Sequence, residues 1–264
     1  MKYHSFLVLL KRTSFSIIIS SCLLLLTISG CKNYTNTPEA SIGREIPIND
    51  SISSDTAIEA YIRPYRTHLN KVLDSTLAYN PKILSKNEKG LNTGIGNFMA
   101  DLVMQQANTV FQKQTGHTID AVLLNYGGIR AELPKGNITS RNAFELMPFE
   151  NEIVIVALKG TAMQEMMTYL QKGHTAHPIS GMQLLLDKKG MLHKATVQGK
   201  PINSNKTYYV ATSDYLQQGG DHMDFFKDPV QLYTINYKLR NAIIDYLKKV
   251  DTIHAKQDNR FTNL

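Results

Sequence analysis

A short apolar run that stops at a pair of glycines is the strongest constraint on the fold of this chain. Residues 119–124 form the run, and the stretch Asn125-Tyr126-Gly127-Gly128-Ile129-Arg130 follows it. A run of this length, ended by glycines, is typical of a buried strand. The glycines can adopt positive φ and bring backbone N–H groups close to a ligand, and Arg130 adds a planar guanidinium suited to phosphate or carboxylate. The stretch therefore predicts an anion site at the end of a central strand. A plain Gly-Gly turn with Arg130 in a surface ion pair is the alternative.

The N-terminus has the pattern of an export signal. Basic residues precede an apolar run at residues 17–28, and small residues follow it up to Cys31. The ending, residues 28–31, resembles the lipobox at which bacterial lipoproteins are cleaved and acylated on cysteine. We therefore expect residues 1–30 to be a lipoprotein signal peptide and acyl chains on Cys31 to anchor the protein to a membrane of the cell envelope, periplasmic or outer. A plain secretory signal or a single N-terminal anchor helix is the alternative.

This assignment limits the chemistry that the rest of the chain can use. The two cysteines are Cys22, within the leader, and Cys31, the expected lipid carrier, so none is left for a disulfide, a thiolate metal site or a nucleophile. Loss of the three basic leader residues leaves 26 basic against 22 acidic side chains and lowers the net charge from +7 to +4. A mildly basic domain suits a small anionic ligand and argues against nucleic acid as a partner.

The remaining chain alternates helical and strand patterns. Residues 31–54 are rich in Asn, Thr, Ser and Pro, which predicts a flexible tether, and residues 55–262 form one domain. Within it, helices are expected at residues 55–73 (with a kink or a late start at Pro64), from 95, and at 141–146, 161–170 and 236–250. Strands are expected at residues 119–124, 153–158, 182–187, 192–197 and 207–212, and a polar tail closes the chain. The alternation predicts an α/β fold.

Three further features allow more than one interpretation. The helix that begins near residues 92–97 offers exposed N–H groups to an anion, or is an ordinary capped helix. Asp101, in the middle of that helix, is expected to make a structural hydrogen bond, with a chemical role as the alternative. His174 and His177 could act as a metal pair, but their loop lacks the third ligand that a metal site needs.

A second glycine pair follows the strand expected at 207–212. Tyr215 offers a stacking face, Gly219 and Gly220 permit tight wrapping around a flat ligand, and Asp221 can accept hydrogen bonds from a pair of hydroxyls. A turn with a core tyrosine is the alternative reading of these four residues.

Taken together, several motifs in this order resemble the C-terminal domain family of the bacterial and animal 5′-nucleotidases. The resemblance covers roughly residues 55–261 and implies that family's four-layer α/β/β/α sandwich. The motifs that carry it are Gly96-Asn97 with Ala100-Asp101, Asn125 through Arg130, Pro148-Phe149 with Asn151, Ser180-Gly181, and Tyr215 through Asp221.

The resemblance implies roles in nucleotide binding for matching positions. Phe149 and Tyr215 would sandwich the nucleobase, and Asn151 and Gly181 match positions near the base. Stacking of this kind is worth on the order of 1–3 kcal/mol per base.

The sugar and the phosphate have matching positions of their own. Asp221 would accept hydrogen bonds from the ribose hydroxyls, Arg130 would bind the phosphate, and Asn125 would lie at the border with the catalytic centre. Two positions depart from the family pattern. Lys89 stands where the family has a phosphate-directed arginine and lacks its bidentate fork, and Asn92 replaces a glutamate.

One part of the family pattern has no counterpart before Asp55. There the family carries a metallophosphoesterase domain, whose Asp, His and Asn residues hold two metals, and the tether contains no such series. The resemblance therefore implies the nucleotide- or nucleoside-binding half of a split 5′-nucleotidase. Catalytic residues and divalent metals would belong to a separate metallophosphoesterase chain, and this chain would hold no cofactor. A binding module that captures nucleosides or nucleotides without catalysis is the alternative. A third reading is an independent hydrolase using Asp221 and His222, but no nucleophile–base set accompanies them.

Overall fold

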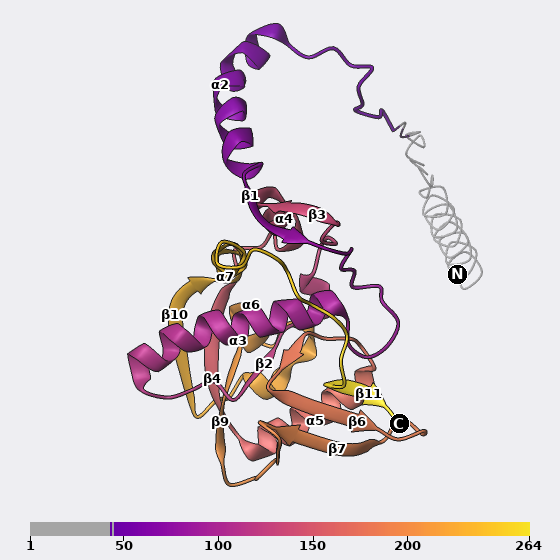
Figure 1. Cartoon of the computed structure of the whole chain (residues 1–264), viewed down its shortest axis with the longest axis vertical. Coiled ribbons are helices and arrows are strands. Elements are labelled where there is room, and N and C mark those ends of the chain that lie inside the picture. The colour runs from indigo at the N-terminus through magenta and orange to yellow at the C-terminus, as the bar shows by residue number, and fades with distance from the viewer. Residues whose placement is uncertain (1–42, 44) are drawn as a thin grey trace, which may run out of the picture. The chain divides into compact units, whose positions relative to one another are not determined.

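The computed structural model describes residue 43 and residues 45–264 of the 264. The expected signal peptide, Cys31 and much of the expected tether lie outside the described residues. The chain divides into two units, Met1–Asp55 and Thr56–Leu264, and the second contains all the helices and strands described below (Figure 1).

A five-stranded mixed sheet lies at the centre of the second unit. Its strand order is β10 (Gln231–Lys238), β4 (Glu152–Lys159), β9 (Thr207–Ser213), β2 (Ala121–Leu123) and β5 (Ile179–Ser180). β2 pairs parallel with β9, and the other pairs are antiparallel. Both faces of this sheet are covered, which explains why β4 is buried along nearly its whole length.

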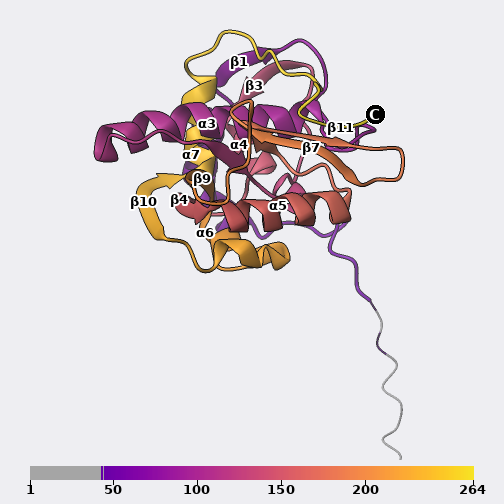
Figure 2. The same ribbon diagram turned by 90° about the horizontal axis from the view of Figure 1, so that it is seen from below.

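The period of two along the strands divides the core between the two faces. Ile153 and Ile155 of β4 pack with α3 (Gly94–Thr115) and α7 (Leu239–Leu247) on one face. Val156 and Leu158 pack with α5 (Gly160–Gly173) and a second sheet on the other. The second sheet has the order β11 (Phe261–Asn263), β6 (Met182–Leu186), β7 (Leu192–Val197) and β8 (Lys200–Pro201). Figure 2 shows α3 and α5 on opposite sides of the central strands.

The other elements surround this core. β1 (Thr76–Asn80) pairs antiparallel with β3 (Gly136–Thr139), which leads directly into α4 (Ser140–Leu146). The short turns η1 (Tyr126–Gly128), α6 (Asp214–Gln217), η2 (Gly220–His222) and η3 (Asp224–Phe226) follow β2 and β9. The N-terminal helix α2 (Thr56–Leu73) runs through Pro64 without a break.

The structure confirms the predicted α/β class and corrects the C-terminal part of the prediction. Residues 231–238 form strand β10, so the helix expected from residue 236 begins only at Leu239. Asn236 has a φ of 50°, and the pairing register shifts between Thr234 and Tyr237, so a bulge breaks the alternation that identifies a strand in sequence. The expected polar tail also contains β11, where Phe261 is buried beside Leu184. Within the described part of the chain, no helix is long and apolar enough to cross a membrane.

Candidate functional site

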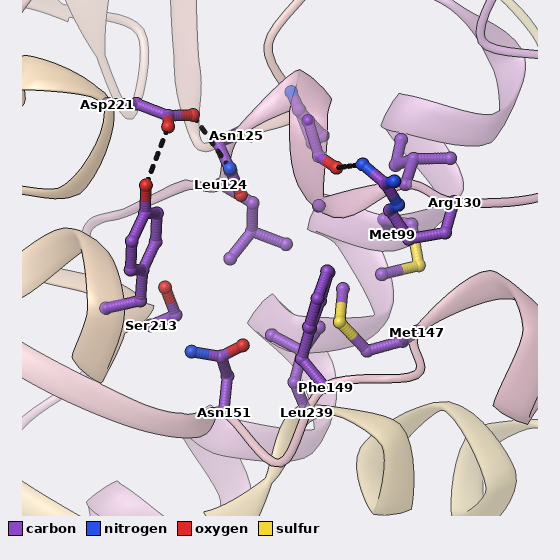
Figure 3. Close-up of a pocket in the computed structure, with 15 residues that line it drawn as sticks. Met99, Leu124, Asn125, Arg130, Met147, Phe149, Asn151, Ser213, Asp221 and Leu239 are labelled. Carbon is purple, nitrogen blue, oxygen red and sulfur yellow. Dashed lines mark hydrogen bonds between the residues drawn. The ribbon is translucent and has the colours of Figure 1, made fainter. Parts of the chain in front are cut away.

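A cavity of about 530 Å³ lies where β2 and β9 end. Six of the seven substrate-binding residues expected from the sequence line it, from three separate stretches of chain (Figure 3). They are Asn125, Arg130, Phe149, Asn151, Tyr215 and Asp221.

Apolar side chains form much of the remaining wall of this cavity. They come from α3, from the loop that follows β2, from the residue after α4 and from the start of α7, and every one of them is buried. Such a surface excludes water from a flat ring laid against it. These residues are Met99, Leu124, Ile129, Met147 and Leu239.

Two aromatic rings are exposed at the cavity. Phe149 lies in the segment between α4 and β4, and Tyr215 lies in α6 directly after β9. Because β4 and β9 are neighbours, the sheet brings the two segments together. Phe149 is 43% exposed and Tyr215 is 47% exposed, which leaves large ring surfaces available to a ligand.

A hydrogen bond connects the two segments that carry these rings. The Asn151 amide nitrogen donates to the Asp214 carboxylate at 2.9 Å. Asn151 stands two residues after Phe149, and Asp214 directly precedes Tyr215, so this bond helps to fix the separation of the rings. Sequence reasoning missed Asp214, because its role depends on a residue 63 positions away.

Arg240, whose role was also not predicted from the sequence, holds the Phe149 segment in place. Its buried guanidinium donates to the carbonyls of residues 147–149 at 3.2–3.4 Å and forms an ion pair with Glu150. Hydrogen bonds from Lys238 and Arg240 lower the pKa of Glu150 to about 2. The sequence contains one sign of this role: an arginine stands among the apolar positions of a helix, and a buried arginine requires partners.

Asp221 accepts hydrogen bonds through both of its carboxylate oxygens. Oδ2 accepts from the Asn125 amide at 2.8 Å, and Oδ1 accepts from the Tyr215 hydroxyl at 2.9 Å, a bond that raises the pKa of Tyr215. Each oxygen retains a further lone pair that can accept from a ligand hydroxyl. A Cβ at Gly220 would lie 2.4 Å from the Tyr215 ring, so a larger residue there would displace the ring.

The loop after β2 differs from the expected backbone cradle. The N–H groups of Tyr126, Gly128, Ile129 and Arg130 already donate to groups of the protein, so they are not free for an anion. Neither glycine has positive φ. A Cβ at Gly128 would lie 2.6 Å from the Asn125 side-chain oxygen, so a larger residue there would displace that side chain. An anion at this loop would therefore be bound mainly by the Arg130 side chain.

Arg130 is exposed at the edge of the cavity. One guanidinium nitrogen donates to the Gly127 carbonyl at 3.3 Å, and the guanidinium carbon lies 5.9 Å from the centroid of the Phe149 ring. Within the described residues, no carboxylate forms an ion pair with Arg130, so the surface ion pair considered from the sequence is not what the structure shows. The remaining N–H donors can meet an anionic group.

The structure does not bring Gly181 and Lys89 into this cavity. Gly181 has a φ of 72° and packs against the Asp120 carbonyl, whereas Pro178 of the same segment lines the cavity wall. Lys89 is exposed and contributes its carbonyl to Gln257. By contrast, Lys86 donates to the Ile129 carbonyl at 2.8 Å and thus reaches the loop that carries Arg130.

The start of α3, Asp101 and the departure from the family pattern at Asn92 have structural explanations. The start of α3 is capped by the Thr93 hydroxyl and the Glu88 carboxylate, as in an ordinary helix. Asp101 forms a bidentate ion pair with Arg260, at 2.8 and 2.9 Å. Asn92 is buried and donates to the carbonyls of Asp258 and Phe261, which fixes the C-terminal segment.

His177 stabilises the loop after β2 that carries Gly127 and Gly128. It is buried, and its Nδ1 accepts a hydrogen bond from the Tyr126 N–H at 3.2 Å. Burial lowers its pKa to about 4, so the ring is neutral at pH 7 and keeps Nδ1 as an acceptor. Among the described residues, no group of three or more His, Cys, Asp or Glu side chains is arranged to hold a metal ion.

Comparison with known proteins identifies the family. The family described as 5'-nucleotidase, C-terminal domain matches residues 75–228, more than half of the chain. The chain therefore belongs to the 5′-nucleotidase C-terminal domain family, as the motifs predicted, and this assignment supports a nucleotide-binding role for the domain.

Curated relatives are similar along most of this chain but are much longer. The apyrase of Tabanus yao is 22% identical over 239 residues, which cover 83% of this chain and 43% of the apyrase. The 5′-nucleotidase of Rattus norvegicus is 23% identical over 243 residues, which cover 83% of this chain and 42% of the relative. The chain thus spans less than half the length of these relatives.

A solved structure shows the same fold. The 5′-nucleotidase precursor of Thermus thermophilus superimposes with a TM-score of 0.65 at 22% identity, over 79% of this chain and 42% of that one. The α/β sandwich expected for this family is thereby confirmed.

Proposed function

We propose that this protein is the nucleotide- or nucleoside-binding half of a split 5′-nucleotidase, and that a separate metallophosphoesterase chain hydrolyses the 5′-phosphate. The cavity would hold the substrate, and the partner would supply the divalent metals and the attacking water. The proposal draws on the family assignment, which supports a nucleotide-binding role for this domain.

The single observation that carries the binding role is the pair of exposed rings at one cavity. Phe149 and Tyr215 offer faces to a base, Asp221 offers acceptor oxygens to ribose hydroxyls, and Arg130 offers donors to a phosphate. These are the three chemical parts of a nucleotide. The apolar wall between them favours a flat ring over a sugar alone.

We also propose that the protein is exported and held at the cell envelope by lipid on Cys31. The leader pattern of the sequence supports this location. So does a relative described as a cell wall protein of Listeria monocytogenes, which is 24% identical over 234 residues.

The test is an AMP hydrolysis assay with a divalent metal. It compares the purified chain, a metallophosphoesterase from the same genome that lacks its own nucleotide-binding domain, and the mixture of the two. We expect rapid hydrolysis only in the mixture and its loss with EDTA. Hydrolysis by the purified chain alone, also lost with EDTA, would contradict the split arrangement.

The second candidate is a lipoprotein that captures nucleosides or nucleotides without catalysis. It is favoured because the residues proposed to hold base and ribose, Phe149, Tyr215 and Asp221, all come from this chain. Tight binding of adenosine by calorimetry, together with a mixture no more active than the metallophosphoesterase alone, would select this candidate.

A further inference from the structure

The helix α2 exposes an apolar stripe that the rest of the described domain leaves uncovered. Tyr61, Tyr65, Leu69 and Val72 follow one another at spacings of four, four and three residues, which places them on one face of the helix. They are between 52% and 72% exposed. None of the 18 residues of α2, all of them described, is buried.

The opposite face of α2 is polar and suited to water. Glu59 and Arg66 form an ion pair at 2.8 Å, and Arg63, Thr67 and Lys71 lie on the same side. The helix is therefore amphipathic and can be covered along its apolar side only. Most of the stability of such a helix comes from packing of its apolar face, so a contact for the stripe is expected.

The C-terminal end of α2 is joined to the element that leads to the cavity. Arg141 of α4 donates to the Asp74 carboxylate at 2.7 Å and to the Asn70 side chain at 3.0 Å. α4 ends at Leu146, directly before the segment that carries Phe149 (Figure 1). A protein bound to the stripe would thus contact a helix connected through α4 to the ring-bearing wall.

The position of α2 in the sequence indicates what covers the stripe. The helix ends at Leu73, and the match to the C-terminal domain family begins at residue 75. This chain accounts for 42% of the rat 5′-nucleotidase and of the Thermus thermophilus chain, and the family is a C-terminal domain. The family is by its description a C-terminal domain, and α2 is the segment directly before the residues that match it.

We infer that the stripe Tyr61–Tyr65–Leu69–Val72 is the docking surface for the metallophosphoesterase chain. This inference rests on the proposed function and adds to it the place where the two chains meet. A partner that arrives as a separate chain needs a non-covalent contact at that boundary. Two adjacent tyrosines, with ring centroids 6.0 Å apart, are side chains of the type that dominates protein interfaces.

The first experiment uses three variants of the full chain, each with a photo-crosslinking amino acid at one position: residue 65, residue 69 or residue 67. Each variant is expressed in the organism from which the protein comes and is crosslinked in the living cells. Mass spectrometry then identifies the adducts. We expect a metallophosphoesterase to be crosslinked from positions 65 and 69 and not from Thr67, on the polar face. Adducts with a second copy of this chain, with lipid alone, or with no molecule would each overturn the inference, as would equal crosslinking from residue 67.

The second experiment compares Leu69→Lys with Thr67→Lys in the AMP assay, with the metallophosphoesterase of the same genome as the titrant. Both positions are exposed, so both variants should fold and keep the adenosine affinity of the wild type by calorimetry. We expect Leu69→Lys to need at least tenfold more metallophosphoesterase for half-maximal hydrolysis, and Thr67→Lys to match the wild type. If the two variants need equal amounts of metallophosphoesterase while the wild-type mixture is active, the docking surface is overturned and the proposed function stands. An inactive wild-type mixture would overturn the proposed function as well.

Discussion

Single residues in the cavity combine binding groups with the contacts that hold them. The Asp221 carboxylate is fixed by Asn125 and Tyr215, and Asn151 is fixed by Asp214. A site whose polar groups are already oriented loses less conformational entropy when a ligand binds.

Arg130 is expected to distinguish nucleotides from nucleosides. The variant Arg130→Gln removes the charge near the Gly127 carbonyl, and a hydrogen bond to a charged group contributes roughly 1.5–3 kcal/mol. We expect the affinity for AMP to fall by roughly 10- to 150-fold and the affinity for adenosine to stay unchanged, both measured by calorimetry. An equal loss for both ligands would show that Arg130 acts on the loop and not on the phosphate.

His177 is expected to make the stability of the domain depend on pH. Burial lowers its pKa from 6.5 to about 4, so between these values the unfolded chain takes up a proton that the folded chain does not. The contribution of His177 to stability is therefore complete above 6.5 and is lost as the pH falls toward 4.

The variant His177→Asn tests this pH dependence, because asparagine can accept the Tyr126 N–H without titrating. Denaturant unfolding at about pH 7 and pH 4.5 should show that the wild type loses on the order of 2 kcal/mol more than the variant. The same loss in both proteins would mean that other groups cause the acid sensitivity.

At the scale of elements, α7 and the central sheet position the rings. Arg240 of α7 connects to three consecutive carbonyls that end at Phe149, and β4 beside β9 sets the distance to Tyr215. The rings thus depend on contacts between segments that are far apart in the sequence.

The variant Arg240→Met should loosen the Phe149 segment, because the carbonyls of residues 147–149 lose the donor that they share. We expect a loss of roughly 1–3 kcal/mol in unfolding free energy, with several-fold weaker adenosine binding. Lys238→Met is the matched control, because it removes the other cation on Glu150 and an exposed pair contributes only about 0–1 kcal/mol. Equal effects of the two variants on adenosine affinity would contradict a positioning role for Arg240.

The elements that sequence predicts well are those with a local, unbroken pattern. β4 and α5 were predicted to within a few residues because alternation and helical spacing are properties of neighbouring residues. β10 was missed because its bulge at Asn236 interrupts the period. β11 was missed because one buried residue, Phe261, carries its contact with the core.

The same distinction holds for the candidate site. Motifs located six residues that line one cavity, including both rings. Lys89 and Gly181 were placed by motif alone and lie elsewhere, because motif spacing does not determine where a loop directs a side chain. Arg240 and Asp214 could not be assigned from the sequence, since each acts through a contact across the fold.

At the scale of the whole molecule, we predict a lipid anchor. Cys31→Ser should move the protein from the membrane fraction to the soluble fraction of the cell envelope, because acylation requires that thiol. Cys22→Ser, which alters the other cysteine, should leave the protein membrane-bound. Fractionation with lipid labelling provides the readout, and membrane retention of Cys31→Ser would refute the anchor.

The central claim is that Phe149 and Tyr215 bind a nucleobase between them. Titration calorimetry with adenosine, on the wild type, Phe149→Ala and Tyr215→Ala, tests it most directly. Each loss of a stacking face should weaken binding by about 1–3 kcal/mol, or roughly 5- to 150-fold. Unchanged affinity in both variants would contradict the account.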